Sequence, residues 1–404
     1  MNYCTNNEKR KREEDEIKKK VDELDKDQLP TANILVAGIT GTGKSTLVNA
    51  VFGDNLAETG TGKPVTSHMN EYSSPRIPIC IWDTVGLELD SQKTKSSIDE
   101  IKKLIVNKSL SENQFDRIHA IWYCINSGSN RYQGAELDFI KSLYKLNVPF
   151  IIVLTQCIGA EEDVNAFEGK IREINASEGM DDIDIVQVIA KEYKTRMYTI
   201  PAYGLKELVE TTMDKLSDFI VKGFVAAQNV CKLQKREQCE EIIYTYVKSA
   251  KEGFWDKIPL ANIFVANKRI MNMFKKIGQM YCDKISPDVI DTIIKESRID
   301  FKNVFAGLID LRRMKYNEKV KKLLNIKKRE GFQVNIDELS KSDRVANMVA
   351  LYGYTFIYAV EKAWEKTTKE NIKNMNEIVD VIIDAMNDRL AKCLGNSNSY
   401  TKLI

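Results

Sequence analysis

The feature that most constrains this sequence is a glycine-rich segment early in the chain. The stretch GITGTGKS (Gly38–Ser45) follows the short apolar run Asn33–Ala37 and precedes the helical pattern Thr46–Phe52. Its spacing, G-x-x-x-x-G-K-[ST], lets backbone N–H groups turn inward and cradle phosphate oxygens at the start of a helix. We therefore expect a strand, a phosphate-binding loop and a helix in direct succession.

This loop pattern also assigns roles to single residues. Lys44 is expected to reach the β- and γ-phosphates of a nucleotide and to act in catalysis, and the Ser45 hydroxyl to ligate Mg²⁺. The other loop residues expected to contact the nucleotide are Gly38, Thr40, Gly41, Thr42, Gly43 and Thr46. The loop alone does not distinguish ATP from GTP.

Short apolar runs alternate with amphipathic stretches from residue 33 to residue 223. We expect strands at 34–37, 77–82, 118–125, 148–154 and 183–189, and helices at 44–52, 92–108, 134–146, 161–178 and 204–222. The weaker run His68–Tyr72 is expected to be an antiparallel edge strand. Strands alternating with helices predict an α/β fold, in which a mostly parallel sheet carries helices on both faces.

The rhythm becomes helical after about residue 223, where we see no convincing strand and only two prolines, Pro259 and Pro287. Helices are expected at 225–252, 258–283, 287–297, 300–325, 336–366 and 369–394. We therefore expect a charged helix at 1–30, an α/β domain at 31–223, an all-helical domain at 224–394 and a tail at 395–404.

A second motif indicates the class of nucleotide. Asp83-Thr84-Val85-Gly86 ends the apolar run Ile77–Trp82, where a carboxylate can hold a Mg²⁺-bound water and the Gly86 amide can reach the γ-phosphate. With these residues the sequence resembles the translation-factor-like P-loop GTPases, especially the Era/TrmE group, and within it bacterial proteins whose G domain precedes a helical domain of unassigned function. The resemblance implies a Ras-like G domain that binds GTP and GDP with Mg²⁺, hydrolyses GTP slowly and acts as a switch on its helical domain.

The same resemblance extends to the switch and base-binding segments. Gly60–Thr66 is similar to the first switch, with Thr66 as the residue that closes on Mg²⁺ in preference to its rivals Thr59 and Thr61. The base-binding motif N/T-K-x-D should follow the strand ending at Leu154, but Thr155-Gln156-Cys157-Ile158 stands there. Thr155, Gln156 and the backbone of Ala190-Lys191, which resembles the fifth motif, are left to read the base. Guanine preference is therefore expected to be weaker than with an aspartate at position 158.

The residues that would orient the attacking water also depart from the common pattern. Leu87 and Glu88 follow Gly86, where many GTPases place a glutamine. The chain then resembles the GTPases that obtain catalytic help elsewhere, and a homodimer through the G domain is one source of it. Glu88 and Arg131 are the candidates within the chain, although solvent-exposed charges are the simpler interpretation of both.

Composition limits the partners that the chain can have. Lys and Arg number 60 against 58 Asp and Glu, and the resulting charge of +2 argues against a globally basic nucleic-acid binder. The eight cysteines are scattered and only two histidines occur, so we expect neither a zinc site nor a disulfide framework. The first residues do not resemble a signal peptide, and the apolar run Val345–Val360 is too short to span a bilayer. It is expected to be a buried core helix in a cytoplasmic protein.

One local charge cluster stands out against this balance. Residues 312–329 hold nine Lys or Arg and one acid, Glu318, which suits contact with an anionic membrane or RNA as well as a solvated helix face. Two alternatives to a soluble switch therefore stay open. One is a dynamin-like or interferon-inducible-GTPase-like protein that assembles on membranes, and the other is a non-hydrolysing, nucleotide-gated scaffold on RNA or ribosomes. The sequence does not identify a protein effector.

Overall fold

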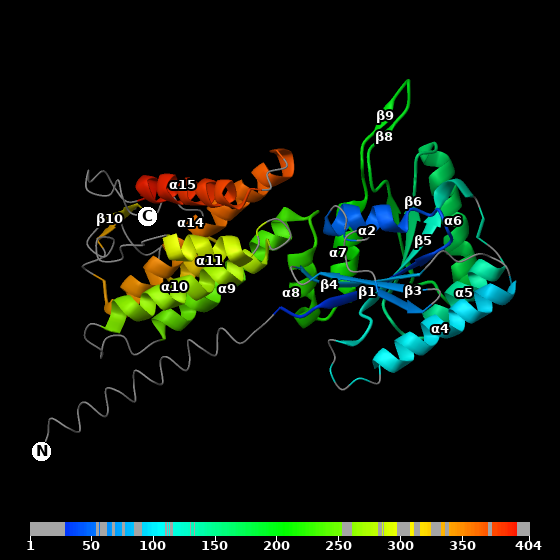
Figure 1. The fold of residues 1–404 in the computed structure, drawn as a ribbon, viewed down its shortest axis with the longest axis horizontal. Coiled ribbons are helices and arrows are strands. Elements are labelled where there is room, and N and C mark those ends of the chain that lie inside the picture. The colour runs from blue at the N-terminus through cyan, green and yellow to red at the C-terminus, as the bar shows by residue number, and fades with distance from the viewer. Residues whose placement is uncertain are drawn as a thin grey trace, which may run out of the picture. The chain divides into compact units, whose positions relative to one another are not determined.

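The computed structural model describes residues 29–53, 56, 63–66, 69–74, 77–84, 91–109, 111, 113, 116–129, 131–132, 134–252, 261–281, 285, 287–296, 308–310, 316–324, 333–335, 339–370 and 374–393. They form two compact units (Figure 1). The α/β unit is Leu29–Lys232, and the helical unit takes the described residues from Leu233 onward.

The α/β unit is built on one sheet of seven strands. Its order is β2-β3-β4-β1-β5-β6-β7, in which β4, β1, β5, β6 and β7 run parallel. The strands are β1 (Ala32–Gly38), β2 (Lys63–Thr66), β3 (Met69–Ser74), β4 (Ile77–Thr84), β5 (Ala120–Asn126), β6 (Phe150–Thr155) and β7 (Asp184–Val188). The predicted α/β class with a mostly parallel sheet is confirmed, because β1 and β4 through β7 occur where the sequence places apolar runs.

Alternating side chains of the central strands fill a core on each face of the sheet. On one face, Tyr123 packs with Phe139 of α5 and Phe150 in a cluster that also takes residues from α4 and α6. On the other, the Trp122 ring stacks on Phe52 of α2 and meets the edge of Phe224 in α8. The helices are α2 (Lys44–Phe52), α4 (Ser91–Ser109), α5 (Ala135–Tyr144), α6 (Glu161–Ser177), α7 (Leu205–Lys215) and α8 (Asp218–Ala227).

Two elements of this unit differ from the sequence prediction. The strand expected at His68–Tyr72 is β3, and it is not the edge of the sheet because β2 pairs with it on the outside. The helix expected at 204–222 is two helices, α7 and α8, because the backbone is extended at Leu216 and Ser217. Since α8 packs on β4 and β1, the α/β unit continues past residue 223.

The helical unit is confirmed as mainly helical, and long helices supply its core. Its helices are α9 (Lys232–Lys251), α10 (Ala261–Gln279), α11 (Pro287–Glu296), α13 (Glu318–Leu323), α14 (Lys341–Glu370) and α15 (Met375–Cys393). As predicted, Val345–Val360 is a buried stretch of α14, where the Phe356 ring stacks on Phe274 of α10. Among the described residues, no helix is long and apolar enough to cross a membrane.

One short strand pair interrupts the helical pattern. β10 (Leu308–Asp310) pairs antiparallel with β11 (Gln333–Asn335), and neither strand was predicted. The helix expected at 300–325 is wrong in extent, because only α13 is helical among the described residues of that range. Three-residue strands carry too little alternation to be recognised in a sequence.

Candidate functional site

The glycine-rich loop joins β1 to α2 in a conformation that only glycine accommodates well. Gly38 has φ +144°, and a Cβ there would lie 2.4 Å from the Cys124 carbonyl oxygen of the neighbouring strand. Gly43, the residue before α2, has φ +83°, in the left-handed region. The loop can therefore bend back toward β5 and enter the helix without side chains in the way.

The start of α2 presents backbone donors that have no partner among the described residues. The N–H groups of Lys44, Ser45 and Thr46 precede the first helical hydrogen bond, which runs from Leu47 N to the Gly43 carbonyl. The residue before the helix is Gly43, which has no side chain to cap this helix end. Such a helix start, with its positive dipole end, is a ready site for an anion.

Lys44 is buried and engaged with its own loop. Its ammonium donates to the carbonyl oxygens of Gly38 at 2.9 Å and Ile39 at 3.2 Å. Thr42 reinforces the same turn, since its hydroxyl donates to the Ile39 carbonyl at 2.9 Å. The Lys44 ammonium is thus held against the loop backbone by two neutral carbonyl oxygens.

Asp83 is the second buried charge of the site. It lies near the end of β4 and is 9% exposed. Burial raises the pKa of this carboxyl to about 6, and the nearby Lys44 ammonium opposes the rise. Its Oδ1 atom and the Thr84 hydroxyl are buried without a hydrogen-bond partner among the described residues. A buried carboxylate oxygen with no partner is an acceptor with capacity for a cation or a donor.

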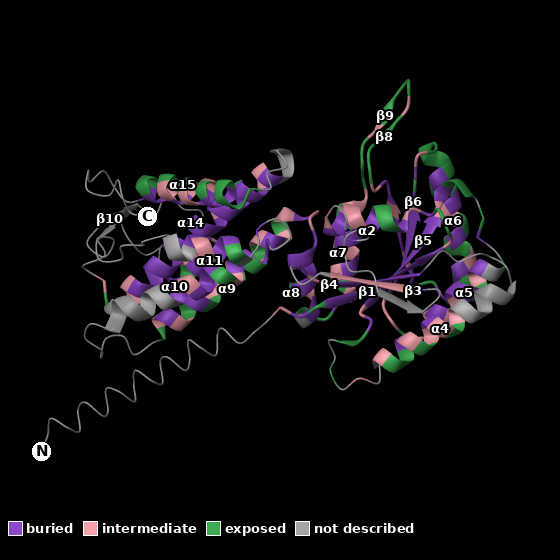
Figure 2. Ribbon diagram, viewed as in Figure 1, coloured by how far each residue is buried: buried purple, intermediate pink, exposed green. Residues whose placement is uncertain are grey.

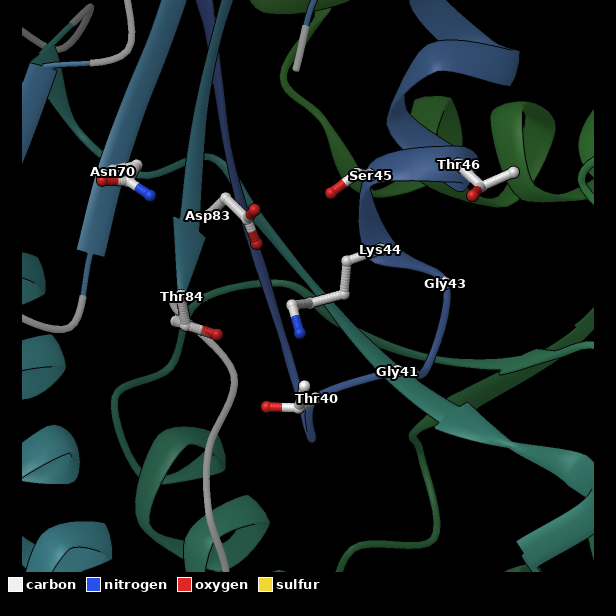
Figure 3. A pocket seen from close by; sticks show the side chains of 9 residues that line it. All are labelled: Thr40, Gly41, Gly43, Lys44, Ser45, Thr46, Asn70, Asp83 and Thr84. Atoms are coloured by element: carbon white, nitrogen blue, oxygen red, sulfur yellow. The ribbon is translucent and has the colours of Figure 1, made fainter. Parts of the chain in front are cut away.

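These groups line one cavity with a volume of about 390 Å³. Figure 3 shows the Lys44 side chain crossing it and the Asp83 carboxylate turned toward that side chain. Ser45 faces the same space from the helix start, and Thr40 lies at its other end. The lining residues are Thr40, Gly41, Gly43, Lys44, Ser45, Thr46, Asn70, Asp83 and Thr84. The cavity thus brings together the expected phosphate-binding loop and the expected metal-binding carboxylate.

Sequence reasoning missed two residues of this lining, Asn70 and Thr84. Asn70 is in β3 opposite Asp83 in the antiparallel register, and Thr84 directly follows Asp83. Thr84 fills a variable position of the Asp83–Gly86 motif, to which the sequence assigned no role, and Asn70 belongs to no recognisable motif. The register of β3 against β4 was the missing information, because it alone brings Asn70 to the cavity.

The donor set fits a hard divalent cation such as Mg²⁺. Asp83 supplies an unsatisfied carboxylate oxygen and Ser45 an exposed hydroxyl, which are oxygen ligands of the type that Mg²⁺ prefers. Thr66 is paired with Met69, which in turn pairs with Thr84, so the β2 backbone places Thr66 at the same end of the sheet. The structure does not describe the Thr66 side chain.

Thr155 and Gln156 bind the loop from β6. The Thr155 hydroxyl donates to the Thr42 carbonyl at 2.6 Å and is 3% exposed. Gln156, with φ +54°, donates from Nε2 to the Gly41 carbonyl at 2.9 Å and accepts from Asn126 Nδ2 at 3.2 Å. Both side chains therefore brace the loop in this structure, and their role in reading a base stays a prediction.

The segment that resembles the fifth motif lies beside β7. Ala190 is partly buried and Lys191 is exposed. The chain returns at Tyr203, which pairs with Ile189 through two backbone hydrogen bonds of 3.1 Å. The Tyr203 hydroxyl donates to the Cys157 carbonyl at 3.4 Å. These contacts hold the 190s next to the segment that follows β6.

Several sequence predictions fall outside the described residues. These are Thr59, Gly60, Thr61, His68, Gly86, Leu87 and Glu88. Arg131 is described and exposed, and it does not line the cavity. Of the basic segment 312–329, the structure describes 316–324, where Lys319 pairs with Glu241 at 2.5 Å and Lys321 with Glu318 at 2.9 Å.

A model of the family described as 50S ribosome-binding GTPase matches residues 33–156, which run from β1 to Gln156, just after β6. This stretch holds the glycine-rich loop, Asp83 and Thr155. It is a P-loop GTPase domain of the Era type.

Relatives of this GTPase domain include proteins from distant organisms. GTPase Era of Vibrio parahaemolyticus is 23% identical over 284 residues, covering 69% of this chain and 83% of Era. Septin-14 of Homo sapiens is 24% identical over 233 residues, covering 52% of this chain and 53% of septin-14. The chain therefore spans about half the length of that septin. Among solved structures, Aquifex aeolicus Era bound to GDP.AlF4⁻ overlaps with a TM-score of 0.32 and 17% identity, covering 55% of this chain and 68% of Era.

Proposed function

We propose that this protein binds GTP together with Mg²⁺, hydrolyses it slowly, and uses the nucleotide state to move its helical unit. The observation that carries the proposal is the Asp83 Oδ1 atom near the Lys44 ammonium, which has no hydrogen-bond partner among the residues that the structure describes. It lies in a cavity lined by the glycine-rich loop and the start of α2. The domain class of residues 33–156 supports GTP as the ligand.

Lys44 is the main phosphate-binding side chain in this proposal. A phosphate oxygen in the cavity is a stronger acceptor than the Gly38 and Ile39 carbonyls that Lys44 contacts now, because charge-assisted hydrogen bonds are about twice as strong as neutral ones. The N–H groups at the start of α2 would hold the neighbouring phosphate oxygens. This arrangement stabilises negative charge that develops on the transferred phosphoryl group.

Ser45, Thr66 and Asp83 are the residues that would hold Mg²⁺. When bound, the ion neutralises charge on the β- and γ-phosphates and orients them for in-line attack. Asp83 would act as its anionic anchor at the end of β4. Its ionised form is the one that serves, so cation binding works against the burial that favours the neutral carboxyl.

Slow hydrolysis follows from the chemistry available near the γ-phosphate. Leu87 follows Gly86, and an aliphatic side chain cannot orient a water molecule. Arg131 is exposed and not in the cavity lining, so the described residues offer no arginine at the phosphates. We propose that a second G domain supplies the missing group in a homodimer.

The end of α2 offers a route for switching. Asn229 N donates to the Val51 carbonyl at 2.7 Å, so the segment after α8 is bonded to the phosphate-binding helix. The same segment is also hydrogen-bonded within itself, because the buried Gln228 side chain accepts from Val230 N and Cys231 N at 2.7 Å each. α9 begins at Lys232, directly after this junction.

Calorimetry on the full chain tests the proposal. Wild type should bind GTP in the presence of Mg²⁺, and Lys44→Ala should weaken binding by about 1.5–3 kcal/mol or more, because one charge-assisted contact in a buried site is lost. Lys206→Ala is the matched control, since Lys206 is an exposed lysine that pairs with Glu210 outside the cavity. Asp83→Ala should mainly reduce the Mg²⁺ dependence.

Two results would contradict this function. Unchanged GTP affinity in a folded Lys44→Ala protein would exclude the cavity as the phosphate site. Equal GTP affinity with and without Mg²⁺, in wild type as in Asp83→Ala, would remove the metal from the proposal while leaving the nucleotide site in place.

A further inference from the structure

A hairpin projects from the α/β unit after β7. We call residues 190–203 the arm. Its strands β8 (Tyr193–Lys194) and β9 (Thr199–Ile200) pair antiparallel, and the Ile189–Tyr203 bridge closes its base. Figure 1 shows the arm extending away from the sheet, and Figure 2 shows it almost entirely as exposed surface. It contributes little to any core, so packing does not explain its residues.

The tip of the arm is held rigid by its own hydrogen bonds. Thr195 N donates to the Tyr198 carbonyl at 2.9 Å, and the Thr195 hydroxyl donates to the same oxygen at 3.0 Å. That hydroxyl also accepts from Met197 N and Tyr198 N at 3.2 and 3.0 Å. The turn is therefore preorganised, which lowers the entropy that a binding partner must overcome.

The arm exposes two tyrosine rings and a methionine side chain to solvent. Tyr198 is 55% exposed, Tyr193 is 41% exposed and Met197 at the tip is 92% exposed. Tyr193 pairs with Ile200 and Thr195 lies opposite Tyr198, so the two tyrosines lie on one face of the ribbon in diagonal positions. Diagonal neighbours on a sheet face are about 7–8 Å apart, within reach for rings that act together.

Charge on the arm selects the kind of partner. It carries three cations, Lys191, Lys194 and Arg196, and one carboxylate, Glu192, which pairs with Lys194 at 2.6 Å. Within the described part of the chain, no ion pair involves Lys191 or Arg196. The arm alone has the net charge of +2 that the whole 404-residue chain has. A partner should thus be anionic and offer flat surfaces to the two rings.

We propose that the arm binds single-stranded nucleic acid, with successive unpaired bases stacked on Tyr193 and Tyr198 and the phosphates near Lys191 and Arg196. Aromatic side chains on a sheet face stack splayed bases, and nearby cations follow the backbone. In a duplex the bases are stacked on one another, so their faces are not available to the tyrosines. A duplex could therefore contact only the charged side chains of the arm. A lipid surface is less suited, because Met197 is the one apolar side chain at the tip and the rings lie along the side of the ribbon.

The test uses the full chain and fluorescence anisotropy with labelled oligouridine and, in a parallel series, labelled oligothymidine. Wild type should bind the single strands more tightly than a duplex of equal length. The double variant Tyr193→Ala with Tyr198→Ala should weaken single-strand binding about a hundredfold, roughly tenfold for each ring removed. The RNA and DNA series together show which strand is preferred.

Matched variants separate stacking from charge and from folding. Tyr193→Phe with Tyr198→Phe should bind almost as wild type does, because the rings remain, and so should Thr199→Ala on the opposite face of the ribbon. Arg196→Ala should lower the slope of log affinity against log salt by about one. GTP affinity should stay the same in all of these variants, because the changed residues do not line the nucleotide cavity.

Any of four results would overturn the proposal. Wild type could fail to bind either single strand at low salt, or the double alanine variant could bind as wild type does. Phosphatidylserine vesicles could be bound through the two tyrosines while single strands are not, which would assign the arm to a lipid surface. Sedimentation could show a dimer that the double variant loses without any nucleic-acid binding, which would assign it to a second copy of the chain.

Discussion

At the scale of single residues, the site depends on charges that are held in place before any ligand arrives. Lys44 is buried against the Gly38 and Ile39 carbonyls, and Asp83 is buried with one oxygen unpartnered. An isolated buried charge is costly, so each of these groups is more stable once an opposite charge enters the cavity. Binding of the proposed phosphate and Mg²⁺ would therefore relieve part of a cost that the fold already bears.

Position 158 offers a test of base selection. Ile158→Asp should sharpen the preference for GTP over ATP, because a carboxylate there can accept hydrogen bonds from guanine N1–H and its 2-amino group. A good bidentate contact to a base discriminates by about 1–3 kcal/mol, so the ratio of the two affinities should rise about tenfold or more. Competition calorimetry with both nucleotides measures it. A wild-type protein that already binds ATP as well as GTP would contradict the guanine preference.

Gly38 offers a test of the loop geometry. Gly38→Ala should destabilise the α/β unit by at least about 1–3 kcal/mol, because φ +144° is strained for alanine and its Cβ would meet the Cys124 carbonyl at 2.4 Å. Urea unfolding followed by tryptophan fluorescence reports the change, since Trp82 and Trp122 lie in this unit.

The control for this prediction is a glycine that has room. Gly169 lies inside α6, and a Cβ there would meet no atom within 4 Å. Gly169→Ala should therefore stabilise the protein by about 0.5–1 kcal/mol, the usual gain in a helix interior. Equal effects of the two substitutions would show that the loop tolerates a side chain at Gly38.

At the scale of elements, the junction of α5 with β5 contains a buried carboxyl. Glu136 is 3% exposed and accepts a hydrogen bond from the Tyr123 hydroxyl at 3.2 Å. Burial raises the pKa of this carboxyl from 4.5 to about 7, although the Tyr123 hydrogen bond opposes the rise. The folded protein therefore binds this proton more tightly than the unfolded chain does.

The free energy of unfolding should then fall as pH rises from about 4.5 to about 7, by at most about 3 kcal/mol from this group. Glu136→Gln should remove this part of the slope and be more stable than wild type at about pH 8, because the neutral amide keeps an acceptor for Tyr123. Urea unfolding at several pH values measures it. Asp138→Asn, an exposed acid in the same helix, should leave the slope as it is.

How much of the fold the sequence predicts depends on how local the signal is. The spacing of residues within Gly38–Ser45, and the place of Asp83 at the end of an apolar run, are local sequence signals. They were enough to predict the cavity and its two charged groups. The bond from Gln156 to Gly41 was not, because it joins residues 115 positions apart and replaces a lysine of the family pattern. The arm was not recognised either, since its two-residue strands have no core face to give them an alternating pattern.

At the scale of the whole molecule, the source of catalytic help determines the kinetics. If a second G domain supplies it, the rate of GTP hydrolysis per molecule should be slow in dilute solution and rise with protein concentration. A dilution series read out as phosphate release measures this. A fast rate that is the same at every dilution would point instead to a residue within the chain, and Arg131→Ala and Glu88→Ala would identify it.

Contact of the basic segment 312–329 with anionic lipid or RNA stays a prediction for the whole molecule. Lys319 and Lys321 each pair with a glutamate, so part of the positive charge is already balanced within the helical unit. Reversal of Lys321, Lys322, Lys327 and Lys328 to Glu should abolish any such association without changing GTP affinity, and the association should weaken steeply with salt. Liposome flotation and RNA binding by wild type at low salt are the first measurements, and a negative result in both nucleotide states would leave a solvated face.

The hydrogen-bonded junction from Gln228 to Cys231 has a mechanical consequence. Asn229 is bonded to Val51, and the Gln228 side chain accepts from the backbone N–H groups of Val230 and Cys231, so this stretch is hydrogen-bonded both to α2 and within itself. If α2 is displaced along its axis, either the bond at Val51 breaks or Lys232, where α9 begins, travels with the helix. In the second case, a displacement at the phosphate-binding end of α2 would be transmitted through this nine-residue helix to the start of α9.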